Sequence, residues 1–175
     1  MLELREILKV TADGADDDGV LATLVDVKGS GYRLAGARML IGADCTSIGT
    51  VSGGCLEADI LERANQVRRT GEPTLVTYDT TKNDNSVFGL GMGCRGVVRV
   101  LLEPARASET LSFIRGCFDK RKRGAVSTLI SKTESVDVPV FARYFSRGAA
   151  LVSGQNGAEL NGLLSAVTRD AMTAM

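Results

Sequence analysis

The sequence predicts a mixed α+β fold, in which short strands form sheets and helices pack on them. Hydrophobic residues make up 44% of the 175 residues and charged residues 24%, which is typical of a folded soluble chain. Short β-branched or aliphatic runs alternate with longer stretches of helical period. Aromatic residues are only 5% and Trp is absent, so we expect a core of Val, Leu, Ile, Ala and Met.

The first half is expected to contain two helices and five strands. The apolar period of residues 2–12 predicts a short amphipathic helix, with Leu4, Ile7 and Leu8 on one face. An acidic loop at 13–19 leads to β-branched or aliphatic runs, which predict strands at 20–27, 37–43 and 47–51. A helix is expected over 55–69, ended by Gly71 and Pro73. A strand at 74–79, a glycine-rich loop at 80–96 and a strand at 97–103 complete this half.

The second half repeats this layout loosely. A helix is expected at 108–123, followed by strands at 125–131, 139–146 and 149–152 and a closing helix at 158–169. G-V-L-A-T-L-V from Gly19 is similar to G-A-V-S-T-L-I from Gly124. We therefore expect one domain over 1–175, with subrepeats 1–104 and 105–175 if this likeness is more than chance between β-rich stretches.

Charge and hydropathy exclude several classes of function. The 21 basic and 21 acidic side chains cancel, which argues against a nucleic-acid footprint. The basic run 120–123 is interpreted as a solvated helix end. No apolar run in the sequence is long enough to span a membrane, and the N-terminus lacks a signal-peptide core. We expect a cytoplasmic protein with reduced cysteines.

The absence of His narrows the chemistry further. It removes Ser-His and Cys-His catalytic pairs and the commonest transition-metal ligand. The cysteines stand at 45, 55, 94 and 117 without a C-x-x-C pair, so no metal site is expected. Cys117 falls in an apolar helix pattern and is assigned to the core, and Cys45 lies in a hairpin.

The first candidate site is the loop T-V-S-G-G-C-L-E. Gly53 and Gly54 allow a sharp turn and close approach to a ligand, and Ser52 can cap the helix that follows. Cys55 then stands where helix amides favour an anion, with Glu57 partly opposing this. The alternative is that Cys55 is a small buried residue after a tight turn.

The second candidate site is the glycine-rich loop G-L-G-M-G-C-R-G. Its glycines leave many backbone amides open to anionic oxygens, and an arginine adds a bidentate donor. Because a strand follows, the loop is neither a Walker nor a dinucleotide motif. We hypothesise that Cys55 and Cys94, the cysteines of the two candidate sites, face one pocket. The alternative is that the glycines of this second loop only allow a crowded turn. The residues assigned to this loop are Gly89, Gly91, Gly93, Cys94, Arg95 and Gly96.

Three segments together resemble the N-terminal region of the XdhC/CoxI family, accessory proteins of xanthine dehydrogenase and aerobic carbon monoxide dehydrogenase. They are G-S-G-Y-R-L-A-G-A-R-M-L-I (29–41), G-T-V-S-G-G-C-L-E (49–57) and G-L-G-M-G-C-R-G-V-V-R-V-L-L-E-P (89–104). The resemblance covers about 19–104. Tyr32 stands where the family usually has proline. The family also usually continues into a Rossmann-like domain that this sequence lacks, so we expect a short relative or a separate partner domain.

The resemblance implies a non-enzymatic accessory protein that transiently binds the molybdenum cofactor, as molybdopterin or its dinucleotide form. The protein would present it to a cysteine desulfurase for sulfuration and then to a molybdenum hydroxylase apo-enzyme. Cys55 and then Cys94 are the expected sulfur-facing residues, and Arg33, Arg38 and Arg95 the expected anion partners, beside Ser52, Gly53 and Gly54. Self-association as a dimer is also expected.

Two other functions stay open from the sequence. The first is an enzyme, a sulfur transferase that carries a persulfide on an accessible Cys55 thiolate. The second is a docking module for the target dehydrogenase that does not bind the cofactor.

Overall fold

The computed structural model describes residues 2–12, 18–81, 95–106, 108–132, 134 and 139–147, and the backbone of 150–154. The chain divides into two compact units, Met1–Ser108 and Glu109–Met175. In the described residues, each unit contains one sheet and at least one helix.

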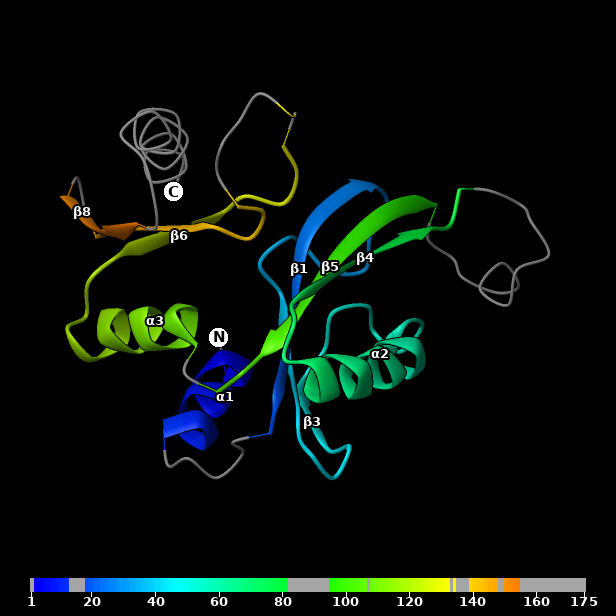
Figure 1. The fold of residues 1–175 in the computed structure, drawn as a ribbon, viewed down its shortest axis with the longest axis horizontal. Coiled ribbons are helices and arrows are strands. Elements are labelled where there is room, and N and C mark those ends of the chain that lie inside the picture. Colours follow the sequence, from blue (N-terminus) through cyan, green and yellow to red (C-terminus); the bar gives the residue numbers. More distant parts are fainter. Residues whose placement is uncertain are drawn as a thin grey trace. The chain divides into compact units, whose positions relative to one another are not determined.

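The first unit is built on an antiparallel sheet with the strand order β3-β2-β1-β5-β4 in the described part of the chain (Figure 1). Strands β1 and β5 form the long central pair, although they are far apart in sequence. The predicted mixed α+β class is confirmed. The elements are α1 (Leu2–Ala12), β1 (Val20–Gly29), β2 (Arg38–Ile41), β3 (Ser47–Gly49), α2 (Glu57–Thr70), β4 (Thr74–Asp79) and β5 (Gly96–Pro104).

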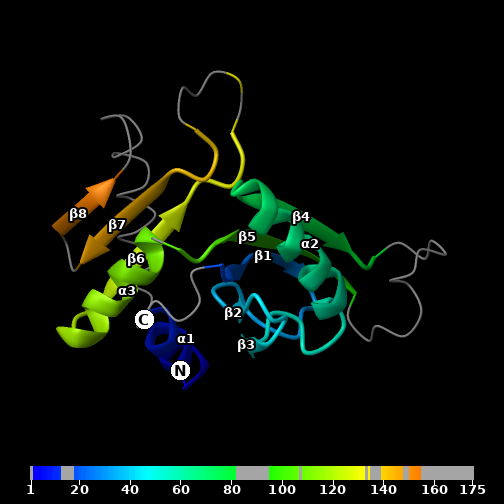
Figure 2. The ribbon, with the colours of Figure 1, turned by 60° about the horizontal axis from the view of Figure 1, so that its bottom comes forward.

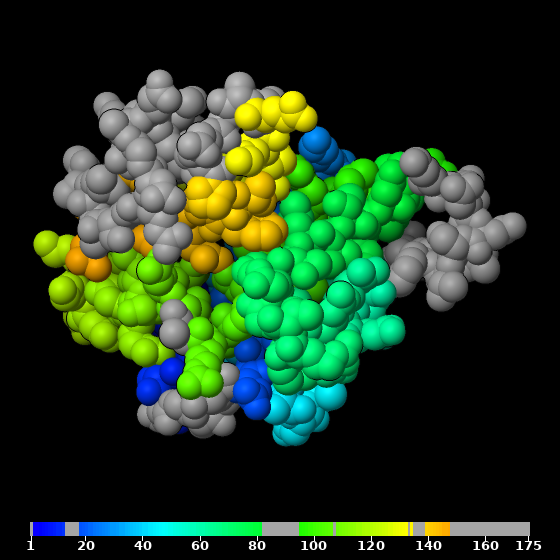
Figure 3. All heavy atoms as spheres, in the orientation of Figure 1, coloured from blue at the N-terminus to red at the C-terminus, as the bar shows by residue number. Residues whose placement is uncertain are grey.

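Helix α2 covers one face of this sheet because its apolar residues follow the helical period. Ile60, Ala64 and Val67 are buried, at the i, i+4, i+7 spacing of a single face. They share a core with alternate residues of the central strand, Val20, Ala22 and Leu24. Figure 3 shows the atoms of α2 forming the surface in front of the sheet. The helix ends at Gly71, which has a left-handed φ of 72°, as the sequence predicts.

The opposite face of the sheet is also apolar. Leu21 and Leu40 pair across β1 and β2 and are fully buried. Helix α1 buries Ile7 and Leu8 and contacts β2 and β3. The sheet is therefore covered on both faces, which explains why long stretches of β1 and β5 are apolar without alternation.

An irregularity in β1 changes which residues face α2. The register with β5 shifts between Leu24 and Asp26, as at a β-bulge. Val27 thereby joins the α2 side and packs against the core. Asp26 pairs with Arg99 at 2.6 Å instead of being buried under the helix. The bulge thus extends the apolar face to Val27, near the end of β1.

The second unit contains α3 (Glu109–Asp119) and an antiparallel sheet (Figure 2). Its described strands, in spatial order, are β6 (Gly124–Thr128), β7 (Arg143–Arg147) and β8 (Ala150–Gly154). The rings of Phe113 and Phe145 lie 5.1 Å apart between helix and sheet. The guanidinium of Arg147 lies 5.5 Å from the Phe113 ring centre, which adds a cation–π contact.

The strand expected at 125–131 ends at Thr128, and two further predicted boundaries in this unit are wrong for local reasons. The helix expected to reach residue 123 ends at Asp119, because Arg121 takes a positive φ of 49°. The strand expected from 139 begins at Arg143, because Phe141 has a φ of 71° and Ala142 N–H donates to the Pro139 carbonyl. Both positive φ values interrupt regular structure. The helix expected at 158–169 lies outside the described residues.

In the part of the chain that the structure describes, no helix is long and apolar enough to cross a membrane. The same residues contain no cluster of three or more Cys, Asp or Glu side chains that could hold a metal ion.

Candidate functional site

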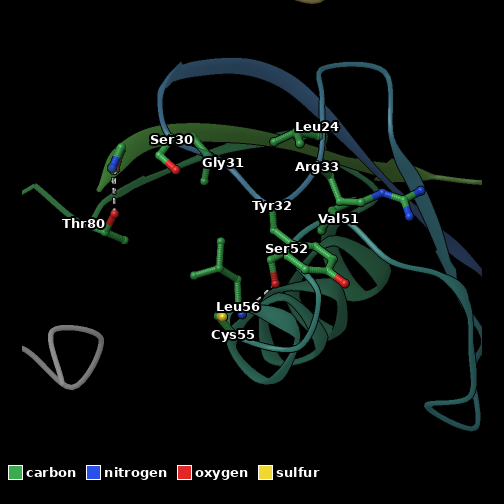
Figure 4. A pocket seen from close by; sticks show the side chains of 12 residues that line it. Leu24, Ser30, Gly31, Tyr32, Arg33, Val51, Ser52, Cys55, Leu56 and Thr80 are labelled. Carbon is green, nitrogen blue, oxygen red and sulfur yellow. Dashed lines mark hydrogen bonds between the residues drawn. The ribbon is translucent and has the colours of Figure 1, made fainter. Parts of the chain in front are cut away.

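A pocket of about 40 Å³ opens in the first unit beside Cys55 (Figure 4), and we call it the Cys55 pocket. Its wall is mainly apolar, with four hydroxyl-bearing side chains, one thiol and one guanidinium among the described residues. It is lined by Leu24, Ser30, Gly31, Tyr32, Arg33, Val51, Ser52, Cys55, Leu56, Thr80, Gly96 and Val98.

Strand pairing brings these residues together from four parts of the chain. The loop after β1 supplies residues 30–33, and the loop before α2 supplies 51–56. Thr80 follows β4 and Gly96 begins β5. Because β1 and β4 both run antiparallel to β5, the ends of the first two meet the start of the third at one sheet edge. The pocket lies where the 51–56 loop covers this edge.

Thr80 and Gly96, the described residues at the two ends of the predicted glycine-rich loop 80–96, lie at this edge. Thr80 N–H donates to the Gly96 carbonyl at 2.9 Å, and Gly96 N–H donates to the Thr80 hydroxyl at 3.0 Å. Ser30 N–H donates to the Arg95 carbonyl at 3.1 Å. A Cβ on Gly96 would lie 2.6 Å from the Ser30 carbonyl oxygen, so close backbone packing requires this glycine. Gly89, Gly91, Gly93 and Cys94 lie outside the described residues.

The carboxylate of Glu57 organises the loop that carries Cys55. It accepts hydrogen bonds from the Thr50 hydroxyl at 2.5 Å and from the Ser52 hydroxyl. It also accepts hydrogen bonds from the backbone amides of Ser52 at 3.1 Å, Gly54 at 2.9 Å and Leu56 at 3.2 Å. Leu56 N–H also donates to the Ser52 hydroxyl oxygen at 2.9 Å. The predicted capping of α2 by Ser52 is nevertheless wrong, because Leu56 is the N-cap residue and no side chain caps this helix. The loop therefore wraps around an anion of its own.

The electrostatics of Glu57 follow from these donors. Burial by itself would raise the pKa of this carboxyl, because it disfavours the charged form. The hydrogen bonds from the hydroxyls of Ser52 and Thr50, and then from backbone amides, outweigh burial and lower the pKa to about 2. Glu57 is therefore ionised at neutral pH, which adds a negative charge next to Cys55.

This arrangement changes the expected role of the loop amides. The sequence suggested that they face an outside anion, but the amides of Ser52, Gly54 and Leu56 point to Glu57. Gly53 N–H donates to the Thr50 hydroxyl at 3.0 Å. Cys55 itself is exposed at the pocket rim and is not the buried residue of the alternative interpretation. The loop thus presents a thiol rather than an open amide cradle.

The three candidate arginines lie in different surroundings. Arg33 lines the pocket, but its guanidinium binds Glu3 of α1 at 2.6 Å. Arg38 is not among the lining residues and donates to the Gly36 carbonyl at 3.0 Å. Burial lowers the pKa of Arg38. Arg95 is exposed beside Gly96 at the edge of the pocket. Only Arg95 of the three combines exposure with a place next to the lining residues.

Sequence reasoning missed Tyr32 as a site residue. Its ring lies against Gly53, where an added Cβ would be 2.4 Å from the ring. Gly53 has a φ of 78°, so the glycine provides both the backbone conformation and the space. The apolar lining residues Leu24, Val51, Leu56 and Val98 were also missed as site residues, because their sequence pattern is that of ordinary core.

The other described cysteines take no part in the pocket. Cys45 is exposed in the hairpin between β2 and β3, and Cys117 is buried in α3. Both placements agree with the sequence prediction.

Comparison with known proteins shows that this chain is similar to proteins named as a xanthine dehydrogenase subunit and as a molybdenum cofactor insertion chaperone. The chain is 37% identical over 121 residues to a probable xanthine dehydrogenase subunit of Bacillus subtilis. It is 29% identical over 120 residues to the molybdenum cofactor insertion chaperone PaoD of Escherichia coli. Residues 13–79 match the XdhC and CoxI family. The chain belongs to the XdhC/CoxI family.

A solved structure agrees with this assignment. A crystal structure of a xanthine dehydrogenase from Bacillus halodurans is similar with a TM-score of 0.68 at 29% identity, over 89% of this chain. The alignments cover 68% and 67% of this chain but only 36% and 37% of the B. subtilis and E. coli proteins. They cover 46% of the solved chain. The chain thus spans less than half the length of these relatives.

Proposed function

We propose that this chain binds the molybdenum cofactor at the Cys55 pocket and presents it for sulfuration and insertion into a molybdenum hydroxylase. The observation that carries the proposal is the exposed Cys55 thiol on an apolar pocket that is also lined by Thr80 and Gly96. The kinship with an insertion chaperone supports it.

The residues of the pocket fit part of the molybdenum cofactor. A thiol is a soft ligand and suits the metal and dithiolene end of the cofactor. Leu56 and Val98 offer apolar contact to its ring system. The phosphate needs a cation, and the exposed Arg95 is the candidate, because Arg33 is paired with Glu3. The bound group would supply the molybdenum chemistry, while this chain binds it, orients it and shields it from water.

The test compares two exposed thiols of the same chain. Cys55→Ser should retain the fold but lower activation of an apo molybdenum hydroxylase in a reconstitution assay. Cys45→Ser changes an exposed thiol outside the pocket and should activate normally. Equal activation by both variants would remove Cys55 from the mechanism. Cofactor titration read by absorbance separates a chaperone from a docking module, which would activate without binding the cofactor.

A second candidate is a persulfide carrier, and the exposure of Cys55 favours it. The Cys55 thiolate would attack the outer sulfur of a persulfide on a donor protein such as a cysteine desulfurase. A Cys55 persulfide would form and the donor would leave as a thiolate. Mass spectrometry after incubation with a loaded desulfurase should then show one added sulfur on the wild type and on Cys45→Ser, but not on Cys55→Ser. If the wild-type chain stays unmodified, the persulfide carrier is contradicted and the cofactor chaperone remains as the proposed function.

A further inference from the structure

The Cys55 pocket is suited to an uncharged part of a ligand. Three of its lining residues, Leu24, Val51 and Leu56, are buried side chains without polar atoms. Among the described residues that line it, Arg33 alone is charged, and its guanidinium is paired with Glu3. A phosphate or a metal ion that entered the pocket would lose its hydration without gaining an oppositely charged partner, which is unfavourable in free energy. An apolar, uncharged group has no such cost.

Tyr32 supplies a supported aromatic surface at the side of this pocket. The ring rests against the Gly53 backbone, which leaves no room for a Cβ. Nevertheless 69% of Tyr32 is exposed. Figure 4 shows Ser30 and Gly31 at one end of the pocket, Leu56 and Cys55 at the other, and Tyr32 alongside. A ring held from behind and exposed elsewhere can stack on a flat ligand with little loss of side-chain entropy.

The size of the pocket limits what enters it. A volume of about 40 Å³ is far below that of a complete cofactor. It admits the edge of a planar ring while the rest of the ligand lies outside against Tyr32. The hydroxyl of Ser30 lines the same pocket and can hydrogen-bond a ring nitrogen or carbonyl.

We propose that the Cys55 pocket recognises the pterin part of its ligand, a flat nitrogen heterocycle, and that Tyr32 is the residue on which this ring stacks. The inference rests on the proposed function and deepens it, because it assigns the ring to Tyr32 and leaves the sulfur and metal end to the exposed Cys55. A guanine base shares the same fused, hydrogen-bonding ring chemistry, so the experiment includes it as a separate arm.

The test uses free pterin, whose fluorescence reports binding without a loaded enzyme. The full 175-residue chain is titrated into pterin, and in parallel competed with guanosine monophosphate. Saturable binding of pterin is expected. Tyr32→Ala should weaken it roughly 10-fold or more, as loss of one stacking contact does, and Tyr32→Phe should retain it. Leu34→Ala, which changes an 83% exposed side chain of the same loop outside the pocket, should bind as the wild type does.

Several outcomes would overturn the inference. They are no pterin binding by the wild type, equal binding by Tyr32→Ala, or tighter binding of guanosine monophosphate than of pterin. Thermal melting of each variant shows whether weaker binding reflects lost folding. If the alanine variant is unfolded, loss of pterin binding by a folded Tyr32→Phe would still contradict stacking, because this variant keeps the ring. If cofactor transfer succeeds but the affinity for pterin does not depend on Tyr32, the proposed function stands and this inference fails. Tyr32-dependent pterin binding without transfer supports the inference and contradicts the chaperone function.

Discussion

Glu57 replaces the outside ligand that the sequence of its loop suggests. Glycine-rich turns before helices attract anions because their amides lack partners. Here the chain supplies the anion itself, from the first turn of α2. The amides of Ser52 and Gly54 turn inward to Glu57, while Cys55 between Gly54 and Leu56 is exposed. The position of the candidate thiol therefore depends on one carboxylate.

Replacing this carboxylate should loosen the loop. Glu57→Gln keeps one oxygen acceptor but loses the charge that the hydroxyls and amides converge on. We expect a stability loss of about 1–2 kcal/mol near neutral pH, since hydrogen bonds to charged groups are the stronger ones and partial exposure reduces them. Urea unfolding measures the loss. Glu62→Gln changes an exposed glutamate of the same helix and should have little effect.

The role of the Glu57 carboxylate also predicts how the free energy of unfolding changes with pH. The pKa of Glu57 falls from an ordinary 4.5 to about 2 on folding. Its contribution is therefore complete above pH 4.5 and is lost as the pH falls toward 2. The wild type should lose more stability over this window than Glu57→Gln does. Parallel curves for the two proteins would show that the carboxylate is not specifically stabilised in the fold.

Gly53 should tolerate substitution less well than another glycine of similar conformation. Gly53→Ala combines a left-handed φ of 78° with a clash against the Tyr32 ring at 2.4 Å. Gly36→Ala has the same kind of φ, 95°, but no atom within 4 Å of the new Cβ. Gly36→Ala should cost about 1–2 kcal/mol for the backbone alone, and Gly53→Ala clearly more. Equal unfolding free energies for the two variants would mean that Tyr32 moves aside freely.

Among the elements, α2 and β4 are joined by a polar link at the edge of the core. The Tyr78 hydroxyl donates to Asp59 at 2.6 Å, and Asp59 also pairs with Arg63 at 2.5 Å. Burial and then the bond to Asp59 raise the pKa of Tyr78 above its ordinary value. The link ties the helix that follows the Cys55 loop to the strand that leads to Thr80.

A double-mutant cycle should measure this link between α2 and β4. Tyr78→Phe should cost about 1 kcal/mol, and combining it with Asp59→Asn should cost less than the sum of the two single changes. Spectrophotometric titration should also show tyrosine ionisation at lower pH in Asp59→Asn than in the wild type. Additive unfolding energies would contradict a direct interaction.

The sequence predicted the elements better than it predicted the site. The burial of Ile60, Ala64 and Val67 follows from local periodicity, and Gly71 ends α2 as expected. The start of α2 was predicted two residues early, because Glu57 reaches back and holds residues 52–56 in a turn. The Cys55 pocket depends on β1 pairing with β5, which is a contact between distant parts of the chain. No local pattern could therefore have shown that Tyr32 faces the same pocket as Thr80.

At the scale of the whole molecule, the two units have a similar element order. In the described residues, each unit starts with a helix that is followed by three antiparallel strands, α1 with β1, β2 and β3, and α3 with β6, β7 and β8. This order is what a repeat of one unit would produce, and the single domain with two subrepeats stays a prediction. Every described residue that lines the Cys55 pocket belongs to the first unit.

The first unit should therefore fold and keep the pocket without the second. Residues 1–108 include the sheet, both helices that cover it and the core between α2 and the strands. We expect the fragment to unfold cooperatively, and its Cys55 to react with an alkylating reagent as fast as Cys55 of the 175-residue chain. Mass spectrometry of timed alkylation measures this, with the hairpin Cys45 as the internal reference. A fragment that melts without cooperativity, or in which Cys55 but not Cys45 changes its rate, would show that the second unit maintains the site.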